Sequence, residues 1–231
     1  MDIFDDFIYP LAARYRTQAN PVYAQSMSGY MRYQFEFFGI KQPQRRIIDK
    51  QFLKEYGLPA IPVLEQLLPE LWQLPERDFQ YFAIELAAAC KYYQHKTSLP
   101  MIEQLIVQRS WWDTVDAISS LLVAPYFRHF PEQMHQTAHQ WIESDNIWLQ
   151  RTAIIFQRKY KGQTDRELLF SMIRRQAASK EFFIQKGIGW ALREYAYMYP
   201  EIVRAFVATQ PLSNLSRREA LRRINAGATK E

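Results

Sequence analysis

A spacing of 35 residues between similar apolar segments limits how this chain can fold more than any other feature. Residues 79–84, 114–118, 149–154 and 184–188 can be laid over one another, which places Tyr81, Asp116, Arg151 and Lys186 at equivalent positions. One step back in the same register falls on Arg46. The period lies between those of tetratricopeptide and HEAT repeats, and it is typical of an α-solenoid built from helix pairs.

Apolar residues recur at three- and four-residue spacing along most of the chain, which predicts helices. These helices cover residues 63–74, 80–93, 99–107, 148–160, 166–175 and 182–197. Breaks are expected at Pro75, Pro100, Pro131, Gly162 and Pro200, and candidate N-caps are Asp145, Asn146 and Ser179. No segment shows convincing strand-like alternation. We predict an all-α fold, an α-solenoid of HEAT-like helical repeats, as a single domain over residues 1–231 with a loose tail at 225–231.

Composition agrees with a globular protein and excludes several kinds of site. Hydrophobic residues make up 48% of the chain and aromatic residues 15%, so a packed core is expected. The lone cysteine, Cys90, excludes an internal disulfide and a cysteine-rich zinc site. The four histidines show no metal-ligand spacing, so neither a metal nor a cofactor is expected. The apolar runs are too short to span a bilayer and the acidic start is unlike a signal peptide, so we expect a cytoplasmic protein with no membrane partner.

The net charge of +5 is distributed unevenly along the chain. Residues 1–145 carry 13 Lys and Arg against 17 Asp and Glu, whereas residues 146–231 carry 16 against 7. A basic C-terminal third rich in arginine favours a polyanionic partner, and nucleic acid is the commonest. A solvated basic exterior with no partner is the alternative.

Residues 110–116 place two indoles and two carboxylates in one short segment that is expected to be helical. Trp112 and Asp116 lie four residues apart, so their side chains project from the same face of a helix. An indole face and a carboxylate together are suited to hold a developing positive charge. The alternative is that the tryptophans are core residues and the aspartates cap a helix or lie in solvent.

In stacked repeats, equivalent positions of successive inner helices form one column on the concave surface. Asp116, Arg151 and Lys186 should then be neighbours in space. Trp112, Trp148 and Trp190 flank this column at nearby positions. Cations, indoles and one carboxylate make a poor protein core, so we expect a concave face that binds duplex DNA.

Several blocks of the sequence resemble the DNA alkylation repair (AlkD-like) family of HEAT-repeat DNA glycosylases. The blocks follow the family's order and cover most of the chain: residues 30–40 with Pro43, Arg45 and Arg46; then 111–116, 144–151, 179–186, 189–190, 192–195 and 215–220. The resemblance implies a solenoid that wraps on duplex DNA and excises cationic N3- and N7-alkylated purines. Such a protein would act at the nucleoid.

The resemblance also implies roles for particular residues. It places the catalytic carboxylate at Asp116, the two lesion-facing tryptophans at Trp112 and Trp190, and the active-site arginine at Arg151. Tyr30 corresponds to a tyrosine that approaches the DNA. Lys41 departs from the family pattern, where an uncharged residue such as glutamine is expected, and this puts the finer contacts to the opposite strand in doubt. The remaining candidate DNA contacts are Arg45, Arg46, Trp148, Lys159 and Lys186, and each basic residue could equally be ordinary solvated surface.

A cationic purine is already a good leaving group, so no acid is needed to protonate it. An ionised Asp116 could stabilise the oxocarbenium character on the deoxyribose and then orient or deprotonate water. Trp112 and Trp190 would flank the sugar, and Arg151 would grip the adjacent phosphate. The resemblance implies that the base stays stacked rather than flipped. No lysine is placed as a Schiff-base nucleophile, so a monofunctional glycosylase acting as a monomer is expected.

Two alternatives from other functional classes remain. A catalytically silent relative would bind bent or branched DNA without releasing a base. A protein-binding scaffold would need apolar anchors on its concave face and no Asp–Trp pair in a basic groove.

Overall fold

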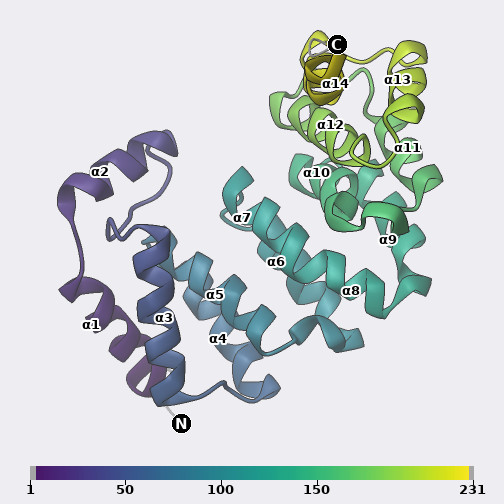
Figure 1. Cartoon of the computed structure of the whole chain (residues 1–231). Coiled ribbons are helices and arrows are strands. Elements are labelled where there is room, and N and C mark those ends of the chain that lie inside the picture. The colour runs from purple at the N-terminus through teal and green to yellow at the C-terminus, as the bar shows by residue number, and fades with distance from the viewer. Residues whose placement is uncertain (1–3, 229–231) are drawn as a thin grey trace. The chain divides into compact units, whose positions relative to one another are not determined.

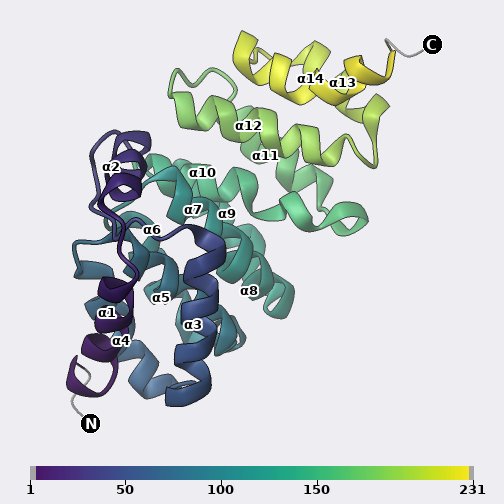
Figure 2. The same ribbon diagram turned by 60° about the vertical axis from the view of Figure 1, so that its left-hand side comes forward.

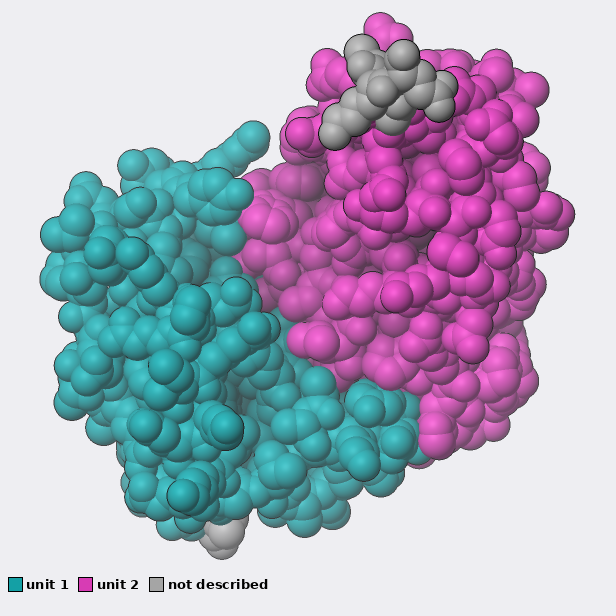
Figure 3. Space-filling view, viewed as in Figure 1, with its two compact units in different colours: residues 1–95 teal, residues 96–231 magenta. Residues whose placement is uncertain are grey.

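The computed structural model describes residues 4–228, and the regular elements of this part of the chain are all helices (Figure 1). The only extended pairing in this part of the chain is an isolated bridge between Glu36 and Glu76. The all-α prediction is therefore confirmed. The chain divides into two compact units, residues 1–95 and 96–231 (Figure 3). Whether they behave as one domain stays a prediction.

The first unit contains five α-helices between a short π-helical turn, η1 (Phe4–Ile8), and a 3-10 turn, η2 (Tyr92–Gln94). They are α1 (Tyr9–Thr17), α2 (Pro21–Tyr30), α3 (Gln42–Tyr56), α4 (Ile61–Gln73) and α5 (Arg77–Ala89). Helix α1 packs on α3, and α4 packs on α5. Large aromatic side chains, among them Tyr15, Phe52, Trp72 and Phe82, fill the core between them. Helix α2 contributes no buried residue.

The second unit begins with η3 (Lys96–Ser98) and continues as helix pairs. Its α-helices are α6 (Leu99–Val107), α7 (Trp112–Ile118), α8 (Ala124–His129), α9 (Pro131–Glu143), α10 (Ile147–Ile155), α11 (Arg166–Arg175), α12 (Phe182–Tyr195), α13 (Pro200–Thr209) and α14 (Asn214–Ala228). A π-helical segment, η4 (Ser119–Val123), joins α7 to α8, and the 3-10 turns η5 (Phe156–Lys159) and η6 (Lys161–Gln163) follow α10.

These helices form two layers. Helix α7 packs on α10, α10 on α12, and α12 on α14, which gives one continuous row. Helices α9, α11 and α13 form the other layer, as Figures 1 and 2 show. The arrangement is that of a helical-repeat solenoid.

The predicted period is visible in where helices start. Helices α3, α5, α7, α10 and α12 begin at Gln42, Arg77, Trp112, Ile147 and Phe182, each 35 residues after the one before. The same period recurs in side-chain hydrogen bonds from three glutamines. The side-chain amides of Gln80, Gln150 and Gln185 each donate to the carbonyl oxygen six residues earlier, at Leu74, Ser144 and Ser179. We call this contact the glutamine bridge; it ties the turn before a helix to that helix.

Helix ends differ from the predictions in a few places. Helix α5 ends at Ala89, because the backbone of Lys91 is left-handed (φ 54°), and α10 ends at Ile155, where 3-10 turns take over. Asn146 is confirmed as an N-cap, since its Oδ1 accepts from the backbone N–H groups of Trp148 and Leu149. Ser179 was wrongly predicted as a cap: α12 starts after Glu181, whose backbone N–H donates to the Ser179 hydroxyl.

The loose tail expected at residues 225–231 stays a prediction. Helix α14 extends to Ala228, and residues 229–231 lie outside the described part of the chain. Between residues 4 and 228, no helix combines the length and apolar character needed to cross a membrane.

Candidate active site

Asp116 on α7 and Arg151 on α10 form a bidentate ion pair in the second unit. Nε of Arg151 donates to Oδ1 of Asp116 at 2.8 Å, and Nη2 donates to Oδ2 at 2.9 Å. The exposed fractions of the two side chains are 5% for Arg151 and 13% for Asp116. The predicted neighbourhood of these two residues is therefore confirmed, and the pair is largely shielded from solvent. A planar fork matched to a carboxylate fixes the orientation of both groups.

The same guanidinium also reaches the next helix of the row. Nη1 of Arg151 donates to the carbonyl oxygen of Phe183, in the first turn of α12. It passes beside Gly187, where a Cβ atom would lie 3.2 Å from Nη1. Arg151 thus joins three successive helices of one layer. With these bonds made, its placement is that of a group that holds Asp116, whereas the sequence led us to expect a grip on a DNA phosphate.

Trp112 is the first residue of α7, and Asp116 follows one turn later. Both side chains are partly exposed. Their four-residue spacing places them on the same face of the helix, as predicted. Asp113, the other carboxylate of the segment, is also partly exposed and lies three residues before Asp116.

Trp148 belongs to an aromatic cluster at the start of α7, α10 and α12. Its ring centroid lies 5.7 Å from that of Trp111 and 5.1 Å from that of Phe183, and the Trp111 and Phe183 rings meet edge to face at 5.0 Å. These contacts give Trp148 a packing role. The side chain is also partly exposed.

Trp190 on α12 is held by two charged side chains. Its Nε1–H donates to Glu194 on the same helix at 3.2 Å. The guanidinium carbon of Arg158, from η5, lies 3.5 Å from the centroid of the indole ring. One face of the indole therefore already has a cation as its neighbour. The π density that Trp190 was expected to offer to the substrate is thus already in contact with Arg158.

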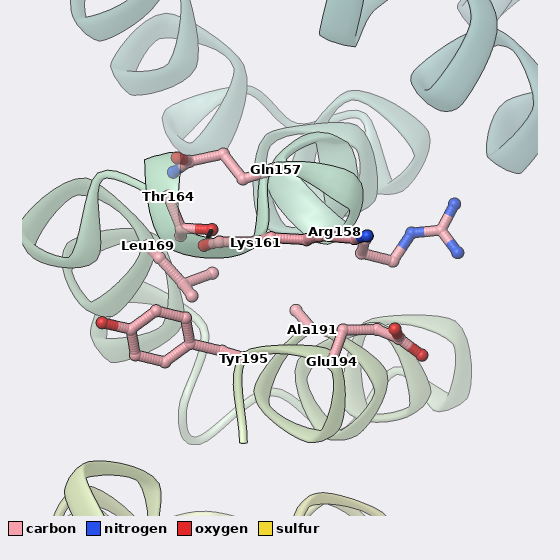
Figure 4. A pocket seen from close by; sticks show the side chains of 8 residues that line it. All are labelled: Gln157, Arg158, Lys161, Thr164, Leu169, Ala191, Glu194 and Tyr195. Carbon is pink, nitrogen blue, oxygen red and sulfur yellow. Dashed lines mark hydrogen bonds between the residues drawn. The ribbon is translucent and has the colours of Figure 1, made fainter. Parts of the chain in front are cut away.

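A small cavity lies behind Arg158 and Glu194, between the η5–η6 turns and α12 (Figure 4). Figure 4 shows both charged groups extending to the same side, away from Leu169 and Tyr195, which close the other end. Its volume of about 10 Å³ has room for about one water molecule and is far too small for a purine.

The remaining basic candidates of this unit lie nearer to solvent. Lys186 donates to Glu219 on α14 at 3.1 Å and is 40% exposed, and Arg193 donates to the other oxygen of Glu219 at 2.7 Å. Burial acts to raise the pKa of Glu219, but hydrogen bonds and charge from Lys186 and Arg193 outweigh it and lower that pKa. Lys159 on η5 is exposed.

The first unit contains the other four candidates. Tyr30 is 72% exposed at the end of α2, and the ammonium of Lys41 lies 4.3 Å from the ring centroid of Tyr23. Arg46 is exposed and pairs with Glu85 at 3.2 Å. These placements leave Tyr30, Lys41 and Arg46 accessible to a partner.

The fourth candidate, Arg45, is placed differently. Its buried guanidinium pairs with Asp49 at 2.7 Å and with Glu85 at 3.1 Å, and it lies 5.3 Å from the Tyr81 ring centroid. This network uses Arg45 inside the first unit, which argues against the predicted DNA contact. On a helix, Arg45 points about 100° away from Arg46, towards the core rather than along the predicted column.

The chain matches the model of a known family over residues 11–224, and that family is described as DNA alkylation repair enzyme. The chain belongs to this family. The predicted resemblance is thus confirmed over nearly the whole length. Membership supports a role in the repair of alkylated DNA, with DNA as the partner.

Two solved structures are similar to this family member. One is titled a predicted DNA alkylation repair enzyme from Enterococcus faecalis; it is 32% identical with a TM-score of 0.82, and the match covers 88% of this chain and 95% of that one. The other, smu.31 from Streptococcus mutans, is 14% identical with a TM-score of 0.60 over 74% of this chain and 89% of its own, and shares the fold. A search of curated proteins found no match.

Sequence reasoning missed several polar neighbours of the candidate site. Ser120 lies four residues after Asp116, and Glu194 lies four residues after Trp190, so helical spacing could have pointed to both. Glu219 comes from the last helix pair, and no periodic signal in a single sequence connects it to Lys186. Only the packing of α14 on α12 brings these two side chains together.

Proposed function

We propose that this protein is a monofunctional DNA glycosylase that hydrolyses the N-glycosidic bond of cationic N3- and N7-alkylated purines in duplex DNA. The observation that carries the proposal is the shielded carboxylate of Asp116, fixed at both oxygens by Arg151 and carried on the same helix face as Trp112. Family membership supplies the class of damage. Hydrolysis of the N-glycosidic bond is what we propose beyond family membership.

Asp116 retains hydrogen-bonding capacity in its ion pair. Each carboxylate oxygen has two acceptor positions, and Arg151 occupies one on each oxygen. The two remaining positions are sufficient to orient a water molecule and to face positive charge on the deoxyribose. As the glycosidic bond lengthens, the neutral base departs with the bonding electrons and the sugar becomes cationic. Water then adds to the anomeric carbon, and its proton passes to Asp116.

The tryptophans would act by excluding bulk water around the sugar. Trp112 and Trp190 supply large apolar surfaces from two helices of the same row, α7 and α12. A base held in the stack would need no pocket of its own, and the cavity next to Arg158 has no room for one. Both points favour catalysis on the backbone side without base flipping.

Phosphate contacts would come from cations that remain open to solvent. Lys159 and Lys186 are the candidates in the second unit, and Arg46 and Lys41 in the first. Tyr30 would contact the DNA through its exposed ring. We propose that the protein binds as a monomer and acts at the nucleoid in the cytoplasm.

The test is release of 7-methylguanine from a duplex that carries one such base. Asp116→Asn should slow single-turnover release by about 100-fold or more, because it removes the charge that faces the sugar. Asp113→Asn is the matched control, since it changes the other carboxylate of the same segment. Binding to undamaged duplex should stay within about twofold for both variants.

Two results would contradict the proposal. Equal loss in both variants would point to a general disturbance of α7 rather than to a role for Asp116. No release by the wild type, together with tight DNA binding, would indicate a silent relative that binds bent or branched DNA.

A further inference from the structure

We infer that Arg158 is a positioning residue that holds the indole of Trp190 and makes it an apolar wall for the deoxyribose rather than a π partner for the substrate's charge. This inference rests on the proposed glycosylase function and names a further residue for it.

The geometry of Arg158 is that of a side chain fixed at several points. Its guanidinium carbon lies 3.5 Å from the Trp190 ring centroid. Nη2 donates to the hydroxyl of Ser120 at 2.8 Å, and Nε donates to the carbonyl oxygen of Ile155 at 3.2 Å. Because Glu194 accepts from the indole N–H, Trp190 is held both across one face and at its edge. These contacts fix the plane of the ring.

Ser120 comes from an irregular part of the helix that carries Asp116. After α7 the backbone widens into the π-helical segment η4, which includes Ser120, and Pro125 follows in the first turn of α8. A proline ring would clash with the carbonyl four residues earlier in a regular α-helix, and a π-helical turn relieves such crowding. Single π-helical turns inside α-helices are frequent at functional sites. Here the turn connects the helix of Asp116, through Ser120 and Arg158, to Trp190 on α12.

The charges around Arg158 agree with a positioning role. Burial lowers the pKa of Arg158 to about 10, and Asp116 and Glu194 act in the opposite direction to Arg151. The guanidinium therefore stays cationic at neutral pH. The positive charges of Arg158 and Arg151 are balanced by the two carboxylates, Asp116 and Glu194, so a phosphate would gain little net attraction here.

A cation on one face of an indole also weakens its attraction for another cation. The quadrupole that would stabilise an oxocarbenium ion is already engaged by Arg158. Trp190 would then contribute shape and exclusion of water. The stabilising charge would come from Asp116.

The experiment compares Arg158→Met, Trp190→Phe and the double variant. It measures single-turnover release of 7-methylguanine, affinity for undamaged duplex and the salt dependence of that affinity. Arg128→Met is the matched control, because it removes a cation that stacks on Tyr160 at 4.4 Å. We expect Arg158→Met to slow release by about 10- to 100-fold, the cost of a misplaced group, with affinity and salt slope unchanged. The double variant should be no slower than the slower single variant.

Arg158→Lys sharpens the test, since lysine keeps the charge but lacks the planar fork that stacks and donates at the same time. Arg158→Lys should therefore release the base little faster than Arg158→Met does. Weaker binding with a salt slope reduced by about one, and an unchanged release rate, would show a phosphate contact instead. Additive losses in the double variant, or losses matched by Arg128→Met, would also overturn the inference.

Failure of the proposed function can be told apart from failure of this inference. If the wild type releases no base, the glycosylase proposal fails whatever Arg158 does. The ¹⁵N-labelled indole resonance of Trp190, assigned by its loss in Trp190→Phe, then gives an independent readout. A shift in Arg158→Met that is absent in Arg128→Met supports the positioning of Trp190, and no shift excludes it.

Discussion

Arg151 and Asp116 are separated by 35 residues, one full repeat, and yet form a bidentate ion pair with N–O distances of 2.8 and 2.9 Å. The candidate catalytic carboxylate is therefore oriented by the next repeat rather than by its own helix. Any change in how α7 packs on α10 would turn the carboxylate. The Asp116–Arg151 contact therefore serves both the stacking of the repeats and the proposed chemistry.

Replacing Arg151 by lysine should separate orientation from charge. Lysine can make one hydrogen bond to Asp116 but not the bidentate pair, so single-turnover release should fall by about 100-fold. Arg151→Met leaves a shielded carboxylate without its partner and should lower the free energy of unfolding by about 3–5 kcal/mol. Denaturant unfolding of both variants beside the release assay checks this. Wild-type rates in Arg151→Lys would contradict it.

Two glycines of α12 offer a matched pair of substitutions. A Cβ at Gly189 would lie 2.5 Å from the Cβ of Glu219, so Gly189→Ala should force α12 and α14 apart and destabilise by about 1–3 kcal/mol. A Cβ at Gly187 would instead meet the end of the Arg151 side chain at 3.2 Å. Gly187→Ala should leave stability within about 1 kcal/mol, because alanine favours helix, while slowing base release. Thermal unfolding and base-release assays on both variants check this. Lower stability in Gly187→Ala than in Gly189→Ala, or wild-type release by Gly187→Ala, would contradict it.

DNA affinity should fall steeply as salt rises, since each phosphate contact contributes close to one to the slope of log affinity against log salt. Lys159→Ala and Lys186→Ala should each reduce the slope by about one. Arg45→Met should leave the slope unchanged but destabilise the first unit, because it breaks a buried network with Asp49 and Glu85. A reduced slope in Arg45→Met would restore Arg45 as a DNA contact.

Asp78 should give the first unit a pH-dependent stability. Burial raises its pKa from 3.8 to about 6, although its Oδ2 accepts from the backbone N–H of Phe38. Between these two values the folded chain binds the proton and the unfolded chain does not, so stability falls as pH rises from about 4 to 6. The full effect is roughly 3 kcal/mol. The unfolding free energy of the wild type minus that of Asp78→Asn should change by about this amount over this pH range. A difference that stays constant with pH would exclude the effect.

The sequence predicts the fold and the central pair because both follow from period. A 35-residue register brings Asp116 against Arg151 without any knowledge of the packing angles. The register does not give the partner of Lys186, which is Glu219 on α14, because α14 starts 32 residues after α12 rather than 35. The shift changes which side chains meet. Period alone cannot give such a change.

Burial of individual cations was also hard to predict. Arg45 and Arg46 are adjacent and chemically identical, yet one is buried in ion pairs and the other is exposed. The column predicted from the repeat contained Arg46, so the rotation of about 100° per residue could have assigned Arg45 to the core side. The contact of Arg158 with Trp190 depends on the 3-10 turns after α10, which apolar periodicity does not predict.

The glutamine bridge, present before α5, α10 and α12, has no counterpart before α7. Val115 occupies the position held by Gln80, Gln150 and Gln185, and a valine side chain cannot donate a hydrogen bond. Other contacts hold the turn that carries Trp111: the Ser110 hydroxyl donates to the carbonyl oxygen of Ile106 at 2.6 Å, and the Trp111 ring packs against Trp148 and Phe183. In the repeat that carries Asp116, the turn into the helix is therefore braced by rings from the two repeats that follow, so a shift of either repeat would be passed on to the turn beside Trp112.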